Sequence, residues 1–147
     1  MEEPRYEEHD YFNTKLPFTL FIDLQRSPDS YSKEANWHEN IELEWYKEGS
    51  GVVLLDGAEQ PIEKNDFIMV NSNVIHQTIP NSFLKYSCLI IDSDFCKNAD
   101  IDYSIINFNS YIKSKELIGI FSRLEKAYND AEIQLFFPFI PIRHINC

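Results

Sequence analysis

The sequence predicts an all-β fold, a small barrel or sandwich, with helical structure towards its C-terminal end. Residues 41–46 alternate apolar and polar side chains with a period of two, which is typical of a half-buried strand. Short apolar runs recur on either side and are separated by turn signals, of which Asp56-Gly57 is a strong one for a hairpin. A helical period is clear only over 114–128. Short strands joined by regular turns are typical of β-barrels and sandwiches.

The strands follow one another in a regular order. We expect short strands over 18–24, 41–46, 52–55, 66–70, 75–79 and 84–91. Two hairpins in series are predicted by the turn 49–51, which contains two glycines, and by Asp56-Gly57. The turn 71–73 holds two asparagines, which tolerate left-handed backbone geometry. A proline and several small polar residues predict a loop over 27–36.

After residue 91 the pattern changes from strands to helices. Residues 92–98 fit one helical turn, and a longer helix is expected over 114–128 with Ser114 as its N-cap. Its apolar face is expected to pack on the barrel and to contribute one edge to a homodimer. The residues assigned to dimerisation are Leu117, Phe121, Leu124 and Tyr128. The apolar tail contains Pro138 and Pro141, which would break a continuous helix there.

The length of 147 residues fits one domain, which we divide into three parts. Residues 1–15 are an N-terminal arm, residues 16–98 the barrel, and residues 99–147 a C-terminal helical dimerisation segment and tail. The arm is expected to pack only where Tyr11 and Phe12 find partners.

Composition narrows the classes of function. The chain has 13 basic against 24 acidic residues, and its formal net charge of −11 would repel a phosphate backbone, so we expect no DNA binding by this chain itself. Three cysteines without metal-type spacing favour a reducing compartment. No segment resembles a signal peptide or approaches the roughly 20 apolar residues of a membrane span. We therefore expect a cytoplasmic protein with no membrane partner.

A polar strand face is the main candidate for a functional site. Successive residues of a strand point to opposite faces, so the polar side chains of this region share one face and the apolar ones the other. The residues assigned to ligand binding are His38, Glu42, Glu44, Tyr46 and His76. If this face lines the barrel, its groups can hold a small polar molecule by hydrogen bonds, with Tyr46 helping to exclude water. If it faces solvent, it is an ordinary polar stripe over an apolar core.

A metal ion is the alternative occupant of the same face. His38, Glu42 and His76 would offer two imidazoles and one carboxylate, a set that suits a divalent transition metal. Three ligands need a water molecule or a further side chain to complete the shell, so no resident metal or other cofactor is favoured. No serine or cysteine nucleophile lies in a recognisable motif, and no catalytic residue is assigned.

Two segments resemble the conserved motifs of the cupin family. The first motif reads His-x-His, three residues, Glu, six residues, Gly, and the chain fits it in two registers that each lose one histidine. The preferred register takes Asn36, His38, Glu42 and Gly49, and the other takes His38, Asn40, Glu44 and Gly51. In the second motif the Gly, Pro, Gly and His positions are held by Asn65, Asn71, Asn73 and His76. Asparagine is a common substitute where the backbone φ must be positive.

The segment from Trp37 to Gly51, together with 65–71 and 75–76, resembles the N-terminal sensor domain of AraC-type transcription regulators. The resemblance extends over about residues 16–130 in the order of elements. It implies an all-β cupin barrel, a jelly-roll-like double-stranded β-helix, with one or two C-terminal α-helices. It also implies a homodimer and a small-molecule effector, for which a sugar is one candidate. The family contacts DNA through a C-terminal helix-turn-helix region, and the sequence after Tyr128 is too short and too weakly basic to supply one.

The sequence thus predicts the effector-sensing and dimerisation domain of an AraC-like regulator without its DNA-binding half. The rival prediction is a stand-alone metal-dependent cupin enzyme, an oxygenase or isomerase, which His38, Glu42 and His76 would serve. A third alternative is a binding or dimerising module whose barrel is filled by aromatic side chains.

Overall fold

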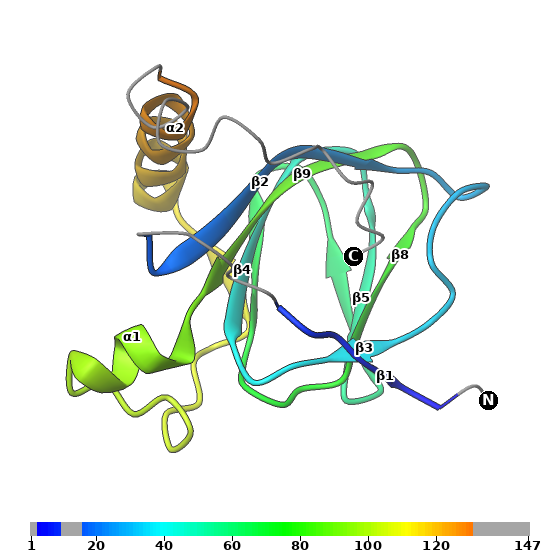
Figure 1. The fold of residues 1–147 in the computed structure, drawn as a ribbon. Helices are drawn as coiled ribbons and strands as arrows, with labels where there is room; N and C mark the ends of the chain where they lie inside the picture. Colours follow the sequence, from blue (N-terminus) through cyan, green and yellow to red (C-terminus); the bar gives the residue numbers. More distant parts are fainter. Residues whose placement is uncertain (1–2, 10–15, 131–147) are drawn as a thin grey trace.

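Two β-sheets lie face to face, and a helix packs outside one of them, in a computed structural model that describes residues 3–9 and 16–130 (Figure 1). The elements in chain order are β1 (Arg5–Tyr6), β2 (Phe18–Arg26), β3 (Asn36–Trp37), β4 (Ile41–Glu48), β5 (Gly51–Leu55), β6 (Ala58–Ile62), β7 (Asp66–Val70), β8 (His76–Pro80), β9 (Leu84–Ile91), α1 (Ser93–Asn98), β10 (Tyr111–Lys113) and α2 (Lys115–Asn129). All six predicted strands are present, and β7 and β9 have the predicted bounds. The predictions for the arm contacts of Tyr11 and Phe12 and for the tail after residue 130 lie outside the described residues.

The strand order shows how the chain moves between the sheets. One sheet has the order β1-β3-β8-β5-β6 and the other β10-β7-β4-β9-β2. All neighbouring strands are antiparallel except β1 and β3, which are parallel. Between β3 and β9 the chain changes sheets repeatedly, as in a jelly roll. The sheets also take in two short strands outside the predicted barrel range of 16–98, namely β1 in the arm and β10 after α1.

The main apolar core fills the space between the two sheets. Its buried residues are Tyr46, Val53, Ile62, Ile68, Val70, Leu84, Tyr86, Cys88 and Ile90. A second cluster lies on the outer face of the second sheet, under α2, and contains Leu20, Leu43, Trp45, Phe67 and Phe121. The central strands of that sheet are therefore covered on both faces, which is why β4 is buried at every position from Ile41 to Tyr46.

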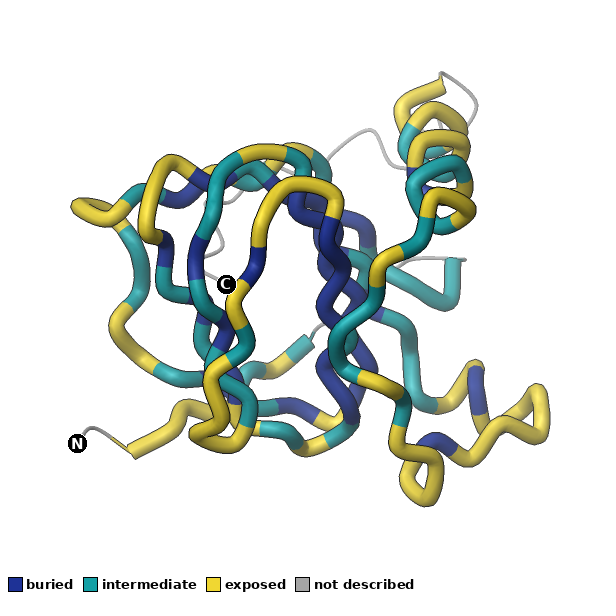
Figure 2. The backbone as a smooth tube through the Cα atoms, turned by 180° about the vertical axis from the view of Figure 1, so that it is seen from behind, coloured by how far each residue is buried: buried dark blue, intermediate teal, exposed yellow. Residues whose placement is uncertain are grey.

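Helix α2 packs on the second sheet through the predicted apolar face. The hydroxyl of Ser114 accepts a hydrogen bond from the backbone of Leu117 at 3.1 Å, which confirms the predicted N-cap. Phe121 is only 1% exposed, and three further residues, Leu117, Leu124 and Tyr128, are partly buried against the same cluster. The outer side of the helix is exposed (Figure 2). Packing on the barrel is thus confirmed, and contact with a second copy stays a prediction.

The shorter helix α1 matches the helical turn predicted over 92–98. Asp92 is its N-cap and accepts a hydrogen bond from the backbone of Asp94 at 2.8 Å. Among the described residues, neither helix is long and apolar enough to cross a membrane.

Only one of the two predicted hairpins is present. Asp56 and Gly57 have φ of 49° and 83° and join the paired strands β5 and β6, as the sequence predicts. The turn 49–51 does not form a hairpin, because β4 and β5 belong to different sheets. Its glycines serve a close approach instead: a Cβ atom on Gly49, whose φ is +87°, would lie 1.9 Å from the carbonyl oxygen of Phe83.

A β-bulge in β2 decides which side chains reach the interior. The pairing of β2 with β9 shifts between Phe21 and Leu24, and Asp23 has a φ of 57°. Before the bulge, even-numbered residues such as Leu20 belong to the outer cluster under α2. After it, Leu24 packs against the core between the sheets, so Arg26 also points to the interior.

Candidate functional site

The polar face of β4 lies inside the barrel. Glu42, Glu44 and Tyr46 are 4%, 3% and 0% exposed, so the alternative of a polar stripe facing solvent is wrong. This orientation follows from the residues on the other face of β4, since Leu43 and Trp45 are needed to pack against α2. The predicted ligand-binding residues of this strand therefore share a buried interior position.

The side chains of His38 and His76, which come from the sheet opposite β4, lie beside the carboxylate of Glu42. His38 follows β3, and His76 begins β8, which pairs with β3. Nε2 of His38 lies 3.0 Å from Oε2 of Glu42, and Nε2 of His76 lies 3.9 Å from the same oxygen. The Nδ1 atoms face backbone carbonyl oxygens, 2.8 Å away at Asn40 and 3.1 Å away at Val74. Each ring is thus oriented by its Nδ1, so that both Nε2 atoms are directed towards Glu42.

The protonation of these groups follows from their burial and their contacts. Burial alone would lower the pKa of His38 and raise that of Glu42, but the hydrogen bond between them reverses both shifts. The pKa of His38 is therefore raised and that of Glu42 lowered, which favours an imidazolium–carboxylate pair. Burial lowers the pKa of His76 despite the nearby charge of Glu42, so its imidazole is neutral at pH 7.

Glu44 is a buried carboxyl of the opposite character. Burial, followed by the negative charge of Glu42, raises the pKa of Glu44 to about 8. Its Oε2 lies 2.6 Å from the hydroxyl of Tyr46, which is also 3.2 Å from the hydroxyl of Thr78. A protonated Glu44 can donate a hydrogen bond beside Glu42, which can only accept.

Arg26 brings a guanidinium into the same interior. Its Nε donates a hydrogen bond to the hydroxyl of Tyr86 at 2.6 Å, and its side chain also lies over the Tyr86 ring, 5.5 Å from the centroid. The residue is 9% exposed. Tyr86 stacks in turn on Tyr46, with ring centroids 5.5 Å apart, so aromatic rings form one wall of the site.

A small cavity lies between these groups. The residues that line it in the described part of the chain are all polar or charged: Arg26, Glu34, Asn36, Glu42, Glu44, His76, Gln77 and Thr78. Its volume of about 10 Å³ leaves room for about one water molecule. Aromatic side chains such as Tyr46 and Tyr86 fill part of the barrel interior. The end of the barrel around this cavity is lined by polar side chains, so the predicted alternative of an interior filled by aromatic packing does not hold there.

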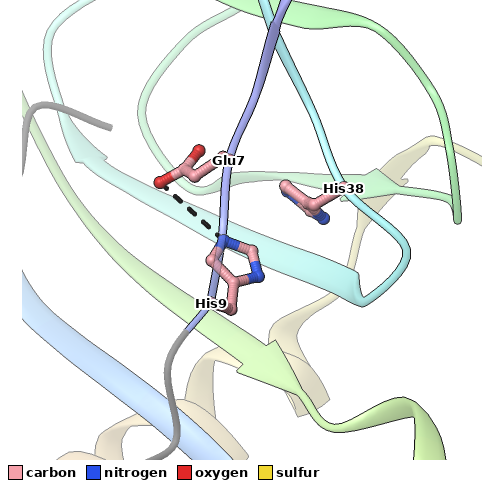
Figure 3. Close-up of side chains that lie close together, drawn as sticks. All are labelled: Glu7, His9 and His38. Atoms are coloured by element: carbon pink, nitrogen blue, oxygen red, sulfur yellow. Dashed lines mark ion pairs between the residues drawn. The ribbon is translucent and has the colours of Figure 1, made fainter.

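The N-terminal segment contributes two further groups near His38. Glu7 and His9 follow β1, which pairs with β3, and Figure 3 shows both side chains beside His38. Nε2 of His9 lies 3.7 Å from Oε1 of Glu7, and the rings of His9 and His38 have centroids 4.3 Å apart. Neither residue was among the predicted site residues, because an arm without a clear period gives no signal of where it docks.

Within residues 3–9 and 16–130, two sets of side chains have the residue types and spacing for a metal ion. His38, Glu42 and His76 form one set, and Glu7, His9 and His38 form the other, with potential ligand atoms within 4.8 Å of one another in each. The first set fits a divalent transition metal, because the two Nε2 atoms and one carboxylate converge and both rings are held through Nδ1. A metal bound there could act as a Lewis acid on an oxygen-containing ligand.

The geometry agrees with the preferred register of the first cupin motif. Asn36 lines the cavity with Glu42, whereas Asn40 of the other register is directed towards α1, where it accepts a hydrogen bond from Ser93 at 3.0 Å. In the second motif, Asn65 and Asn73 at the glycine positions have φ of 72° and 63°. The expected asparagine substitutions are therefore confirmed at both glycine positions.

Several cavity residues were missed by sequence reasoning. Thr78 could have been found, because it follows His76 by two on the same strand and so shares its face. Arg26 could not be found by alternation, since counting from Leu20 places it on the outer face, and only the bulge turns it inwards.

The fold and the site define a β-barrel domain with a buried polar cavity of the kind that binds a small molecule. The chain matches the family described as the AraC-like ligand binding domain over residues 20–136, and it belongs to that family. No curated protein sequence is similar enough to the chain to count as a match. The predicted resemblance is thereby confirmed, and the fold is the predicted all-β cupin-type barrel with a C-terminal helix.

Two solved structures of ToxT share the fold of this chain at low sequence identity. ToxT from Vibrio cholerae strain SCE256, bound to an unsaturated fatty acid, is 11% identical with a TM-score of 0.52, covering 82% of this chain and 51% of that one. ToxT from V. cholerae O395, bound to (E)-4-(8-methylnaphthalen-1-yl)but-3-enoic acid, is 10% identical with a TM-score of 0.53, covering 83% and 54%. A cupin protein from Bacteroides fragilis is 14% identical with a TM-score of 0.45, covering 52% and 64%. This chain therefore spans about half the length of ToxT.

Proposed function

We propose that this chain is the effector-sensing domain of an AraC-like transcription regulator and that it binds a small polar molecule inside the barrel. The observation that carries the proposal is the buried polar cavity between Arg26, Glu42, Glu44 and His76 in a domain of this family. Such a site offers charged donors, a carboxylate acceptor and neutral groups, which together can fix the orientation of a hydroxyl-bearing ligand.

The volume of the cavity says how binding would act on the protein. A space of about 10 Å³ cannot hold a sugar-sized ligand unless side chains move. The ligand would therefore stabilise a more open arrangement of the interior, which is a shift between two populations. In a full regulator this shift would alter how DNA-reading domains are presented, and we propose that DNA is contacted only through such domains, in the cytoplasm.

The predicted homodimer belongs to the same proposal. Phe121 is already buried within its own chain, so the contact would use the edges of the apolar face, where Leu117, Leu124 and Tyr128 keep partial exposure. Ile120, which is 41% exposed on the outer side of α2, extends this surface.

Thermal unfolding with a panel of sugars and polyols tests the sensor function. A ligand present at about 100 times its Kd should stabilise the fold by about 2.7 kcal/mol and raise the unfolding midpoint by several degrees. Glu44→Ala should weaken this effect, because it removes a cavity-lining group and its hydrogen bond with Tyr46, and Glu59→Ala on exposed β6 should leave it unchanged. Equal stabilisation of the two variants by the same ligand would place the ligand elsewhere.

A metal-dependent cupin enzyme is the second candidate function, favoured by the convergence of His38, Glu42 and His76. Metal analysis of the purified chain, before and after chelation, separates the candidates. Metal near one ion per chain that rebinds after chelation and is lost in His76→Ala would support the enzyme. Metal-free protein that responds to an organic ligand would support the sensor.

A further inference from the structure

Arg26 is a buried cation that lines the polar cavity together with Glu34, Glu42 and Glu44. The residue is 9% exposed, and its Nε donates a hydrogen bond to the hydroxyl of Tyr86. Among residues 3–9 and 16–130, no carboxylate forms an ion pair with it within 4.0 Å. Glu44 is near enough to raise the pKa of Arg26, but its side-chain hydrogen bond is with the hydroxyl of Tyr46, at 2.6 Å.

A guanidinium buried in this way calls for a functional explanation of its charge. Burial by itself disfavours a charge, and an aliphatic or amide side chain of similar length would avoid that penalty. Here Tyr86, Glu44 and Tyr46 outweigh burial and hold the pKa of Arg26 above its usual value, so the guanidinium stays charged. Arg26 is also held in place for contact, because the bulge at Asp23 turns β2 inwards and Tyr86 fixes Nε. The two terminal nitrogens of the guanidinium are left for the cavity that Arg26 lines.

We propose that the effector is a hydroxylated carboxylate, of which a sugar acid is the type, and that Arg26 binds its carboxylate group. This inference rests on the proposed sensor function and names the ligand class of the same site. A guanidinium binds a carboxylate through parallel hydrogen bonds, which also fixes the orientation of the ligand. The body of the ligand must be hydroxylated and not aliphatic, because Asn36, Glu42, Gln77 and Thr78 around the cavity are polar.

The experiment compares matched probes on the full chain. Formate against chloride at equal ionic strength tests the anion site with the smallest carboxylate, which requires the least movement of the side chains around the cavity. Galacturonate against galactose then tests the ligand class, because the two sugars differ only at the carboxylate. Unfolding midpoints and calorimetric affinities are measured for the natural chain, Arg26→Gln, Arg26→Lys and the exposed control Arg123→Gln.

We expect formate and galacturonate to raise the unfolding midpoint of the natural chain and of Arg123→Gln. Arg26→Gln should weaken galacturonate binding by about 10- to 100-fold, the loss expected when a charged hydrogen bond is removed. Arg26→Lys, which keeps the charge but not the planar fork, should retain part of the affinity and guards against a misfolded glutamine variant. Circular dichroism verifies the fold of each variant.

Two results would overturn the inference. Equal midpoints in formate and chloride would show that the Arg26 site does not prefer a carboxylate to another anion. Galactose binding as tightly as galacturonate, with both unaffected by Arg26→Gln, would leave the sensor function standing and remove the carboxylate from it.

Discussion

At the scale of single residues, Glu42 and Glu44 lie two positions apart on one strand face and have opposite pKa shifts. The difference comes from their neighbours. Glu42 receives a hydrogen bond from His38 and lies near His76, whereas Glu44 has a phenol beside it and the charge of Glu42 close by. The pair therefore presents an acceptor and a donor side by side, which suits recognition of a hydroxyl group.

Glu44 should make the stability of the fold depend on pH. Its pKa is raised from 4.5 to about 8, so between these values the folded state keeps a proton that the unfolded state has lost. The free energy of unfolding should therefore fall as pH rises through this window, by at most about 1.4 kcal/mol per pH unit. The stability contributed by Glu42, whose pKa is lowered, is lost only as pH falls below 4.5, outside this window.

Urea unfolding of the natural chain and Glu44→Gln across pH 4.5 to 8 measures this contribution. The amide cannot ionise, so the variant should lose part of the downward slope, while the exposed control Glu59→Gln should follow the natural chain. Parallel curves for the natural chain and Glu44→Gln would show that Glu44 ionises normally in the folded state. The histidines remain in both proteins and cancel from the comparison.

At the scale of elements, the crossing from β4 to β5 depends on Gly49. A methyl group there would meet the carbonyl oxygen of Phe83 at 1.9 Å, and the φ of +87° disfavours any L-residue. Gly57 offers a matched comparison, since its φ is +83° but a methyl group would meet nothing within 4 Å.

Gly57→Ala should therefore cost only the conformational term, about 1 kcal/mol, whereas Gly49→Ala should cost about 3 kcal/mol or more because the backbone must also shift. Chemical unfolding of both variants gives the two free energies directly. Similar losses at both positions would mean that the turn 49–51 can move away from Phe83 at little cost.

The same scale shows what sequence patterns could and could not predict. The period-two alternation of apolar and polar residues located β4 and separated its polar face from its apolar face. Both faces of that strand are buried. The alternation failed at β2, where the bulge at Asp23 reverses it and carries Arg26 inwards. It also gave the turn 49–51 the wrong role, since a glycine turn between strands signals flexibility but not which sheet the next strand joins.

At the scale of the whole molecule, the barrel was predictable because its parts agree with one another. The two asparagines at left-handed positions, the hairpin at Asp56-Gly57 and the strand pattern all favour one topology. It was harder to predict which side chains come together at the site. Glu42 and His76 come from different sheets, and Glu7 and His9 reach His38 only because β1 pairs with β3. The distances between these side chains depend on which strands pair across the chain, and the pattern of residues along one strand does not determine that pairing.

The proposed homodimer is a property of the whole molecule, and the exposed side of α2 supplies its test. Ile120 is 41% exposed and would be buried by a partner, so Ile120→Glu places a charge in the contact and should raise the dimer Kd by about tenfold or more. Ile105, 83% exposed in the loop between α1 and β10, is the matched control, and Ile105→Glu should leave the Kd unchanged. Sedimentation velocity over a range of concentrations measures both values. A natural chain that stays monomeric throughout, or a dimer weakened by Ile105→Glu and not by Ile120→Glu, would contradict dimerisation through α2.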